Sequence, residues 1–343
     1  MSENGGLPVD AEFALLLTHD VDRPYKSVQG LYHAVERRDP RQLKSLLPGV
    51  NPWWQFDDIT QLEDSLGVRS AFYFLREKHV FERDLSDWLD PFYWVEHAGR
   101  YDVETPEMRD LLARLDEGGW EVGLHGSYDS YDDLDRLQFE KARLEAALGD
   151  EVVGVRQHHL NRGPDTWAHH REIGLNYDAS PGSSSEYGFD RGYRPLRPFD
   201  DEFVVFPLTL MEAALPDPGE AFDRAWGVCA DLLDEAADND AVMSVLWHPR
   251  LFTEADFPGY RELYRLLVER ALEMGAWVGP PGDYYDLLDH PDGSRTDDRP
   301  GVGDGPPPEI EGRLADGSGQ ESLTRPQAED NKVQTGANGE PTG

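Results

Sequence analysis

Residues that could perform acid–base and metal chemistry follow the apolar runs of this sequence. Carboxylates, imidazoles and one guanidinium recur at these positions more often than chance placement would give. Carboxylates and imidazoles are common ligands of divalent metals and common general acids and bases, so together they suit a site that binds a metal and moves protons. The residues concerned are Thr18, His19, Asp20, Val21 and Asp22, then His125, then Arg156 with His158, then Asp178 and Ser180, and last His248.

The segment 153-VGVRQHHL-160 refines this set through the alternation of side chains along a strand. Alternate residues of a strand share a face. Arg156 and His158 are therefore predicted to point the same way, and His158 joins the site together with Arg156. His159 is predicted to lie on the other face, packed beneath a helix.

Eight short apolar runs that are typical of strands must position these residues. They alternate with helical patterns without a long gap, which indicates a parallel α/β sheet. No Gly-rich phosphate loop follows the first run, which ends in THDVD, so a (β/α) barrel is favoured over a doubly wound sheet. In a barrel the site gathers at the carboxyl ends of the strands. The predicted strands lie at 13–18, 70–75, 121–126, 153–160, 175–180, 203–210, 241–248 and 276–281, and the predicted helices near 26–38, 56–66, 105–118, 131–148, 164–173, 219–237 and 258–274.

The charge balance argues against two classes of partner. The chain carries 68 Asp and Glu against 32 Lys and Arg, a formal net charge of −36. Such a field repels nucleic acid and anionic membranes, so neither is expected as a partner. The acidic residues are spread along the chain and lysine is almost absent, a composition that resembles cytosolic proteins of extreme halophiles.

The apolar content divides the chain into one large domain and two polar ends. Residues 12–290 are predicted to form a single barrel domain after a flexible N-terminus at 1–11. Residues 291–343 are predicted to be a disordered acidic tail, because too few apolar side chains remain to offset the entropy of ordering. No apolar run approaches the roughly 18 residues that span a bilayer. The first residues lack a secretory signal pattern and there is one Cys, so a cytoplasmic protein without internal disulfides is expected.

Four motifs, in this order and at these intervals, resemble those of the polysaccharide deacetylase family, the NodB-homology domain. They are THDVD, EVGLHGSYDS, VGVRQHHL and VLWH, and the resemblance covers residues 12–285. It implies a distorted (β/α)7 barrel. It also implies a bound divalent metal, usually zinc, that serves the hydrolysis of an acetamido group.

The resemblance implies roles for individual residues as well. Asp20 would be the general base and Asp22 a metal ligand, because some branches of the family carry D-x-D with the ligand second. Arg156 would orient the base, and His248 would be the general acid. The chemistry needs these types, since a divalent metal lowers the pKa of bound water and polarises the amide oxygen. A carboxylate accepts the water proton, and a histidine protonates the departing amine.

The second motif departs from the family pattern. The family has H-[ST]-x-x-H, two imidazoles that bind one metal, whereas here His125 is followed by Asp129 at the second position. The resemblance makes His125 a ligand. The third ligand would be Asp129, since carboxylate can replace imidazole on zinc, or else His158. Alternatively, Asp129 or Ser130 caps the helix at 131–148. If neither Asp129 nor His158 is a ligand, metal binding is weak or absent.

Two connections and His158 are candidates for substrate binding. Trp53 and Trp54 lie in 51-NPWWQFDD-58, where aromatic faces would stack on sugar rings; burial of one or both beneath the loop is the alternative. The loop at 180–200 follows a strand end and would border the mouth of the barrel. The arginines of this loop, which would contact an anionic group of the substrate, are Arg191, Arg194 and Arg197.

The sequence thus predicts a metal-dependent hydrolase of non-peptide carbon–nitrogen bonds. The favoured reaction removes an acetyl group from an N-acetylated sugar or glycan precursor, with zinc as the expected cofactor. One alternative is an amidohydrolase on a small non-sugar amide, as in the allantoinase-like branch of the family. The other is a catalytically inactive carbohydrate-binding barrel.

Overall fold

The computed structural model describes residues 7, 11–26, 47 and 49–289. The predicted tail at 291–343 lies outside these residues. So do most of the predicted flexible N-terminus at 1–11 and all but the first residue of the predicted helix near 26–38.

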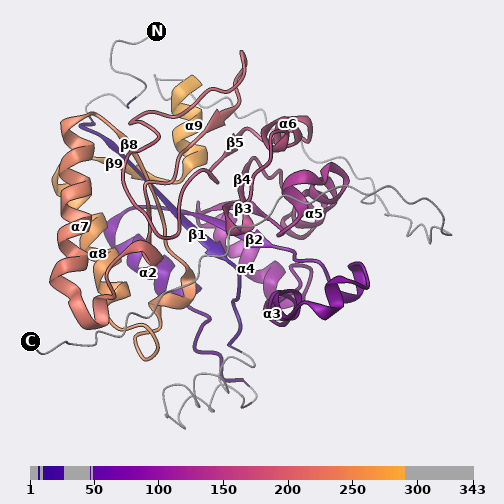
Figure 1. Cartoon of the computed structure of the whole chain (residues 1–343). Coiled ribbons are helices and arrows are strands. Elements are labelled where there is room, and N and C mark those ends of the chain that lie inside the picture. Colours follow the sequence, from indigo (N-terminus) through magenta and orange to yellow (C-terminus); the bar gives the residue numbers. More distant parts are fainter. Residues whose placement is uncertain (1–6, 8–10, 27–46, 48, 290–343) are drawn as a thin grey trace, which may run out of the picture. The chain divides into compact units, whose positions relative to one another are not determined.

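A curled parallel sheet forms the centre of the fold (Figure 1). Every pair of named strands is parallel, and β1 lies between β2 and β8, with β9 paired to its first half. The sheet follows the order β6-β5-β4-β3-β2-β1-β8-β7, so β6 and β7 are its two ends. The predicted barrel-type fold is confirmed as an incomplete barrel. The strands are β1 Ala14–Val21, β2 Ala71–Leu75, β3 Glu121–Gly126, β4 Gly154–Gln157, β5 Tyr177–Asp178, β6 Val204–Val205, β7 Leu210–Met211, β8 Val242–Leu246 and β9 Trp277–Gly279.

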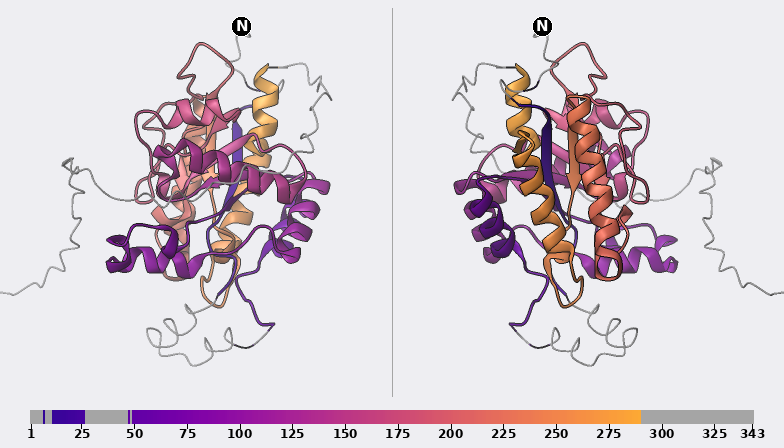
Figure 2. Two further views of the ribbon diagram at one scale, coloured as in Figure 1. Left: turned by 90° about the vertical axis from the view of Figure 1, so that its right-hand side faces the viewer. Right: turned by 90° about the vertical axis from the view of Figure 1, so that its left-hand side faces the viewer.

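Helices connect the strands and pack against the sheet. Helices α4 and α5 contact β3, α6 contacts β5 and α8 contacts β9, while α7 and α8 lie side by side (Figure 2). Two of the helices, α3 and α9, have no counterpart among the predicted ones. The helices are α2 Phe56–Leu66, α3 Pro91–Gly99, α4 Pro106–Glu117, α5 Leu134–Leu148, α6 Thr166–Glu172, α7 Pro218–Asp238, α8 Tyr260–Glu273 and α9 Pro281–Asp289.

The start of α5 differs from its predicted position. The helix begins at Leu134, because the side chain of Asp133 accepts a hydrogen bond from the N–H of Arg136 at 3.0 Å. An acceptor at this position satisfies a helix N–H group that has no partner within the helix. The interpretation of Asp129 or Ser130 as the cap of this helix is therefore wrong.

Strand β1 has one face in the hydrophobic core and one face inside the curl of the sheet. Leu15 and Leu17 belong to the larger hydrophobic core, which the sheet shares with the helices. Leu16 points the other way, into a smaller core built mainly from strand residues. Thr18 and Asp20 continue the face of Leu16, since alternate residues of a strand share a face. The inner face of the curl therefore changes from apolar to polar toward the carboxyl end of β1.

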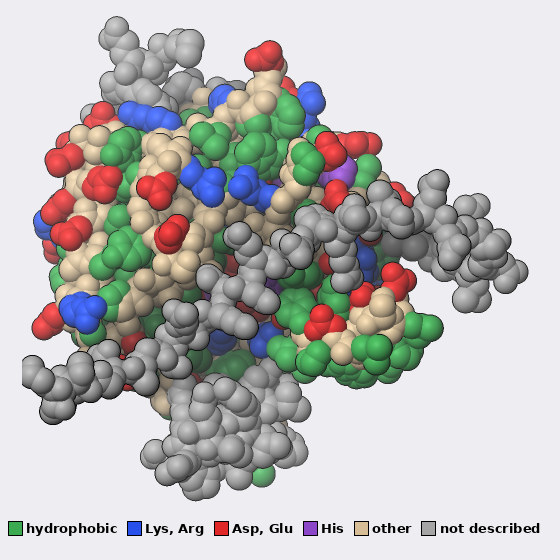
Figure 3. Space-filling model, in the orientation of Figure 1, with side chains coloured by type: hydrophobic (Ala, Val, Ile, Leu, Met, Phe, Trp, Pro, Cys, Tyr) green, Lys and Arg blue, Asp and Glu red, His purple; other side chains and the backbone are tan. Residues whose placement is uncertain are grey.

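Acidic side chains are spread over the surface of the protein. Figure 3 shows Asp and Glu distributed over much of the visible face, with fewer Lys and Arg, as the net charge of −36 requires. Across the described ranges, no helix combines the length and the apolar composition that crossing a membrane demands.

Candidate metal and catalytic site

Asp20 is held inside the curl by Arg156. Both residues are buried, and Nη1 of Arg156 donates to Oδ1 of Asp20 at 3.0 Å. The same nitrogen donates to Oγ1 of Thr18 at 2.7 Å, and Nε donates to the carbonyl oxygen of Ala179 at 2.9 Å. The planar guanidinium is thus fixed by three partners, which fixes the carboxylate in turn. The other oxygen of Asp20, Oδ2, faces His125 at 3.8 Å.

His125 points its Nε2 atom toward two aspartates. Its Nδ1 lies 2.8 Å from the backbone carbonyl oxygen of Arg156, its register partner on β4. A carbonyl oxygen only accepts hydrogen bonds, so Nδ1 carries a proton. Nε2 lies 3.1 Å from Oδ1 of Asp22. In a neutral ring, Nε2 would therefore carry a lone pair that faces the negatively charged carboxylates. A cation between these atoms, or a second proton on the ring, would relieve this repulsion. Burial lowers the pKa of His125, but Asp20 and Asp22 outweigh burial and raise it.

The carboxylate of Asp22 joins two groups of side chains. Its Oδ1 faces Nε2 of His125 at 3.1 Å and Nε2 of His158 at 3.7 Å. Its Oδ2 faces Nε2 of His248 at 3.1 Å and Nη1 of Arg250 at 3.2 Å. Burial raises the pKa of Asp22, but the neighbouring histidines outweigh burial and hold the pKa well below its usual range. Asp22 is therefore ionised, with two imidazoles at one oxygen and a third imidazole at the other.

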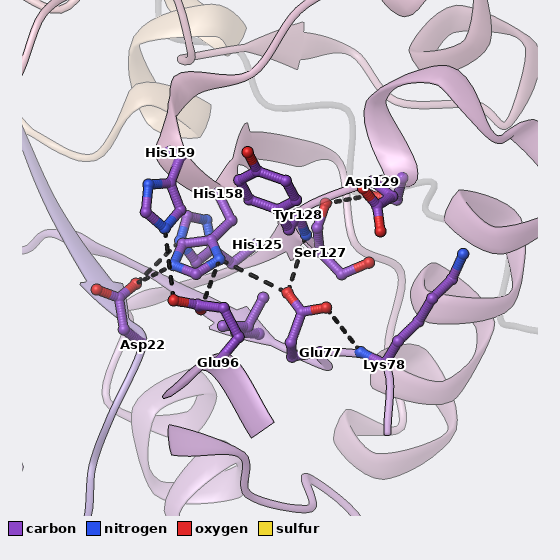
Figure 4. A network of polar contacts seen from close by, with 12 residues as sticks. Asp22, Glu77, Lys78, Glu96, His125, Ser127, Tyr128, Asp129, His158 and His159 are labelled. Carbon is purple, nitrogen blue, oxygen red and sulfur yellow. Dashed lines mark hydrogen bonds and ion pairs between the residues drawn. The ribbon is translucent and has the colours of Figure 1, made fainter. Parts of the chain in front are cut away.

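His158 enters the site through a sharp turn after β4. The strand ends at Gln157, and a short 3-10 turn over His158–Leu160 follows. His159 and Leu160 have φ values of 55° and 56°, left-handed conformations that are uncommon for residues other than Gly. The turn ends the predicted alternation, and the rings of His158 and His159 lie 4.4 Å apart (Figure 4). The prediction that His159 packs beneath a helix is wrong, because its side chain is 45% exposed.

Asp22, His125 and His158 form a set of donors that fits a divalent metal. One donor atom from each residue lies within 4.8 Å of the others. Two imidazoles with one carboxylate are a known ligand set of catalytic zinc. A histidine on a metal usually donates its other N–H to a carbonyl or carboxylate, as His125 does to Arg156. Both the types of the donors and the direction of the His125 ring therefore suit a cation at this position.

His248 is held by Glu212 on the other side of Asp22. Nδ1 of His248 lies 2.5 Å from Oε1 of Glu212, and both residues are buried. Burial lowers the pKa of His248, but the carboxylates of Glu212 and Asp22 outweigh burial and raise the pKa to about 10. His248 is therefore protonated at neutral pH, and its Nε2 carries a proton 3.1 Å from Oδ2 of Asp22.

Asp129 lies outside the donor set of Asp22 and His125. Its carboxylate pairs with Arg83, and Nη2 of Arg83 also donates to Oε1 of Glu77 at 2.6 Å. Figure 4 shows Asp129 set apart from the histidines, to the right of Tyr128. Of the two alternatives for the third ligand, His158 is the one whose donor atom lies in the cluster.

Trp54 and its neighbour Trp53 are both engaged in packing. Trp54 is half-buried, and its ring lies 5.6 Å from that of Tyr25 and 4.9 Å from that of Phe56. Trp53 is buried, and its indole N–H donates to Oδ2 of Asp256 at 3.0 Å. These contacts agree with the alternative of burial for Trp53 and leave part of Trp54 accessible.

The loop that carries Arg191 runs away from the site. Arg191 is exposed, and two residues later the carbonyl oxygen of Tyr193 accepts a hydrogen bond from the N–H of Val242 at 2.9 Å. Val242 begins β8, whereas His248 follows the opposite end of that strand. Arg194 also lies near this far end, where its Nη1 donates to the carbonyl oxygen of Asp240 at 2.7 Å. The structure therefore does not bring these arginines to the cluster around the metal donors.

The strand-end residues Asp178 and Ser180 are completely buried. The N–H of Ser180 donates to Oδ1 of Asp178 at 2.6 Å, and the indole N–H of Trp167 donates to Oδ2 at 2.5 Å. These bonds satisfy the carboxylate internally, so the pair supports the end of β5.

Four charged residues that no motif identifies complete the site. Two of them directly follow strands, so attention to strand ends could have found them: Glu77 lies two residues beyond β2, and Glu212 follows β7. Glu96 comes from α3, for which the sequence shows no periodic pattern. Arg250 lies two residues after His248 and contacts Asp22.

Comparison with known proteins addresses the fold. No family model and no curated protein matches this sequence. A crystal structure of a protein from Mycobacterium smegmatis, described as a polysaccharide deacetylase, aligns over 86% of this chain and 98% of its own, with 16% identity and a TM-score of 0.54.

Two further structures align with TM-scores below 0.5. The chitin deacetylase of Colletotrichum lindemuthianum has a TM-score of 0.44 and 12% identity, over 81% of this chain and 89% of its own. A CE4 family pseudoenzyme from Bacillus anthracis has a TM-score of 0.41 and 14% identity, over 81% of this chain and 66% of its own. The likeness to the Mycobacterium smegmatis protein concerns the fold, and on that basis the chain has the barrel fold of a polysaccharide deacetylase, as its motifs predict.

Proposed function

We propose that the protein is a metal-dependent amidohydrolase that removes an acetyl group from an N-acetylated sugar or glycan precursor. The proposal rests on one observation: the candidate base and the candidate acid lie on opposite sides of Asp22. Asp20 and His125 lie together on one side, and His248 lies at the other oxygen of Asp22. Amide hydrolysis needs a base for the attacking water and an acid for the departing amine. The fold similarity to a protein described as a polysaccharide deacetylase supports a carbohydrate substrate.

Asp22, His125 and His158 would hold the metal, and their donor types favour zinc. A divalent metal, when bound, polarises the amide carbonyl and lowers the pKa of water.

Asp20 acts as the general base. Arg156 holds Oδ1 of Asp20 at 3.0 Å, so the other oxygen, Oδ2, is the one that accepts a proton. This proton comes from the water whose oxygen forms a bond to the acetamido carbon. The fixed orientation of the carboxylate keeps Oδ2 directed to the side of His125.

His248 acts as the general acid. Its Nε2 proton passes to the sugar nitrogen as the carbon–nitrogen bond breaks, and acetate and a free amine leave. Glu212 makes this role possible, because its carboxylate raises the pKa of His248 and keeps the ring protonated at neutral pH.

A non-catalytic carbohydrate-binding barrel is the second candidate function, and Arg250 favours it. Nη1 of Arg250 lies 3.2 Å from Oδ2 of Asp22, so this carboxylate already has a cationic partner from the chain itself. A bound metal would have to compete with that guanidinium.

Release of acetate by the zinc-loaded protein tests the proposed function. Metal-free protein would be reconstituted with Zn²⁺ and incubated in concentrated salt with N-acetylglucosamine oligomers or with a cyclic ureide. The proposal expects acetate from the oligomers, loss of the activity with a chelator and recovery with Zn²⁺. Turnover of the ureide alone would assign the reaction to small non-sugar amides. Absence of both activities together with absence of stoichiometric zinc would favour the binding protein.

A further inference from the structure

We infer that Glu96, His158 and His159 form a second position for a divalent cation. It adjoins the position of Asp22 and His125, and the two positions share His158. The inference goes beyond the proposed deacetylase reaction and does not depend on it. Since His159 is the most exposed of these residues, the second position is the one that opens to solvent.

The carboxylate of Glu96 lies between the two imidazoles. Oε2 is 3.7 Å from Nδ1 of His158, and Oε1 is 3.7 Å from Nε2 of His159. Hydrogen bonds between such atoms measure about 2.7–3.2 Å, so Glu96 accepts a hydrogen bond from neither ring. Two ligands at about 2.1 Å from one tetrahedral ion lie about 3.4 Å apart. The observed spacing is therefore close to that of ligands around a shared metal ion.

Nδ1 of His158 is a buried nitrogen without a hydrogen-bond partner among the described residues. The residue is only 7% exposed. Besides Glu96, the nearest carboxylate is that of Glu77, whose Oε2 lies 3.6 Å away, again too far for a hydrogen bond. Buried polar atoms are rarely left unsatisfied. Figure 4 shows this nitrogen directed between the two carboxylates, where a cation would bind the nitrogen and an acidic oxygen at once.

The backbone turn that presents His159 is strained. His159 and Leu160 are two of the three residues other than Gly with positive φ in the described ranges. Strain of this kind persists where the surrounding structure imposes it, often at functional sites. The rings of Phe92 and Tyr128 lie 5.8 and 5.3 Å from that of His159 and limit its orientation. The protein thus holds an accessible imidazole in a costly conformation next to His158.

The two positions use different nitrogens of one ring. Nε2 of His158 faces Asp22, and Nδ1 faces Glu96. If both positions are filled, the ring must release its remaining N–H proton to solvent. Arg23 also competes for Glu96, since its Nη2 lies 3.3 Å from Oε1. Both effects weaken the second position, so we expect it to fill after the first.

The zinc content of the full chain tests this inference. Metal-free protein would be dialysed to equilibrium against buffered free Zn²⁺, and zinc per chain would be measured by mass spectrometry. The wild type is expected to reach two ions at saturation, and Glu96→Gln and His159→Asn only one. Asn tolerates a left-handed backbone, and the side chain of His159 is exposed, so His159→Asn preserves the fold. His169→Asn, at a half-buried histidine of α6, is the matched control and is expected to keep two ions.

Each result decides the question. A single ion per wild-type chain that Glu96→Gln and His159→Asn both retain would overturn the inference and leave Glu96 as a carboxylate beside His158. A second ion that persists in either variant would also overturn it, because that ion would then lie elsewhere. Acetate release is not part of the measurement. One retained ion would leave the deacetylase proposal standing, and failure of the deacetylase assay would leave the zinc count unaffected.

Discussion

The imidazole of His125 donates a hydrogen bond from Nδ1 to the backbone carbonyl oxygen of Arg156, 2.8 Å away on the neighbouring strand. The side chain of the same Arg156 donates to Asp20 at 3.0 Å. One residue of β4 therefore directs His125 toward Asp22 and fixes the carboxylate of Asp20. The proposed metal ligand and the proposed base are coupled through this single position.

Replacement of His158 and of Asp129 distinguishes the two alternatives for the third ligand. We expect His158→Ala to lose tightly bound zinc, because it removes a donor atom from the cluster at Asp22. Asp129→Ala should keep the zinc, because the carboxylate of Asp129 is paired with Arg83. Zinc content after exhaustive dialysis is the measurement, with His125→Ala as the reference for loss of the tightly bound ion. Retention of zinc without His158 and loss without Asp129 would reverse the assignment.

Arg156→Lys is expected to reduce turnover with little change in zinc content. Lysine keeps the charge, but a single ammonium group cannot reproduce the guanidinium contacts with Asp20, Thr18 and Ala179. Loss of orientation at a catalytic group can reduce the rate about 100-fold. Steady-state kinetics together with zinc analysis would show this, and circular dichroism would establish that the variant is folded. Unchanged kcat would mean that Arg156 does not position the base.

Glu212→Gln should move the alkaline limit of activity to lower pH. The carboxylate of Glu212 raises the pKa of His248 to about 10, and the general acid works only while this ring is protonated. Removal of one nearby opposite charge lowers such a pKa by about one to three units. The pH dependence of kcat would show activity falling at a lower pH in the variant. If kcat falls at the same alkaline pH in both proteins, Glu212 does not set the pKa of the general acid.

The free energy of unfolding should fall below neutral pH because of His170. This residue is completely buried, and burial lowers its pKa to about 4. The unfolded chain, with an ordinary histidine pKa of about 6.5, binds more protons between these two values. The stabilisation is therefore complete above about pH 6.5 and is lost as the pH falls through about 4, by about 3 kcal/mol in total.

Urea unfolding at about pH 7 and about pH 4.5 would measure this effect. His170→Gln should remove this part of the pH dependence, and His169→Gln, at the neighbouring histidine that is only half-buried, should retain it. The same pH dependence in the wild type and in His170→Gln would assign the acid sensitivity to other groups.

Local patterns were sufficient to predict the elements that carry the motifs. A helical pattern placed α2 at its observed bounds, and an apolar run placed β3 so that His125 lies near its carboxyl end. Parallel strands bring their carboxyl ends to one edge, so the proximity of Asp22, His125 and His248 follows from strand order and chain direction.

Contacts that depend on long-range packing could not be predicted in this way. Glu96 is one acid among 68, and nothing in its local sequence separates it from solvated surface carboxylates. Glu77 and Glu212 follow strands, but that position alone does not show that their side chains are buried against histidines. The alternation along β4 failed after Gln157, because the backbone leaves the extended conformation there. No local rule anticipates two consecutive left-handed residues of which neither is Gly.

The paired assay of wild type and Asp20→Asn tests the central claim most directly. Both proteins would be loaded with zinc, analysed for metal content and incubated with N-acetylglucosamine oligomers, and acetate would be measured. Asp20 contacts Arg156 and lies beyond hydrogen-bond distance of His125, so the variant should bind as much zinc as the wild type. We predict that the wild type releases acetate and free amine in equal amounts, and that the variant is slower by about 100-fold or more. Equal rates in the two proteins, or no acetate from the zinc-loaded wild type, would contradict the account.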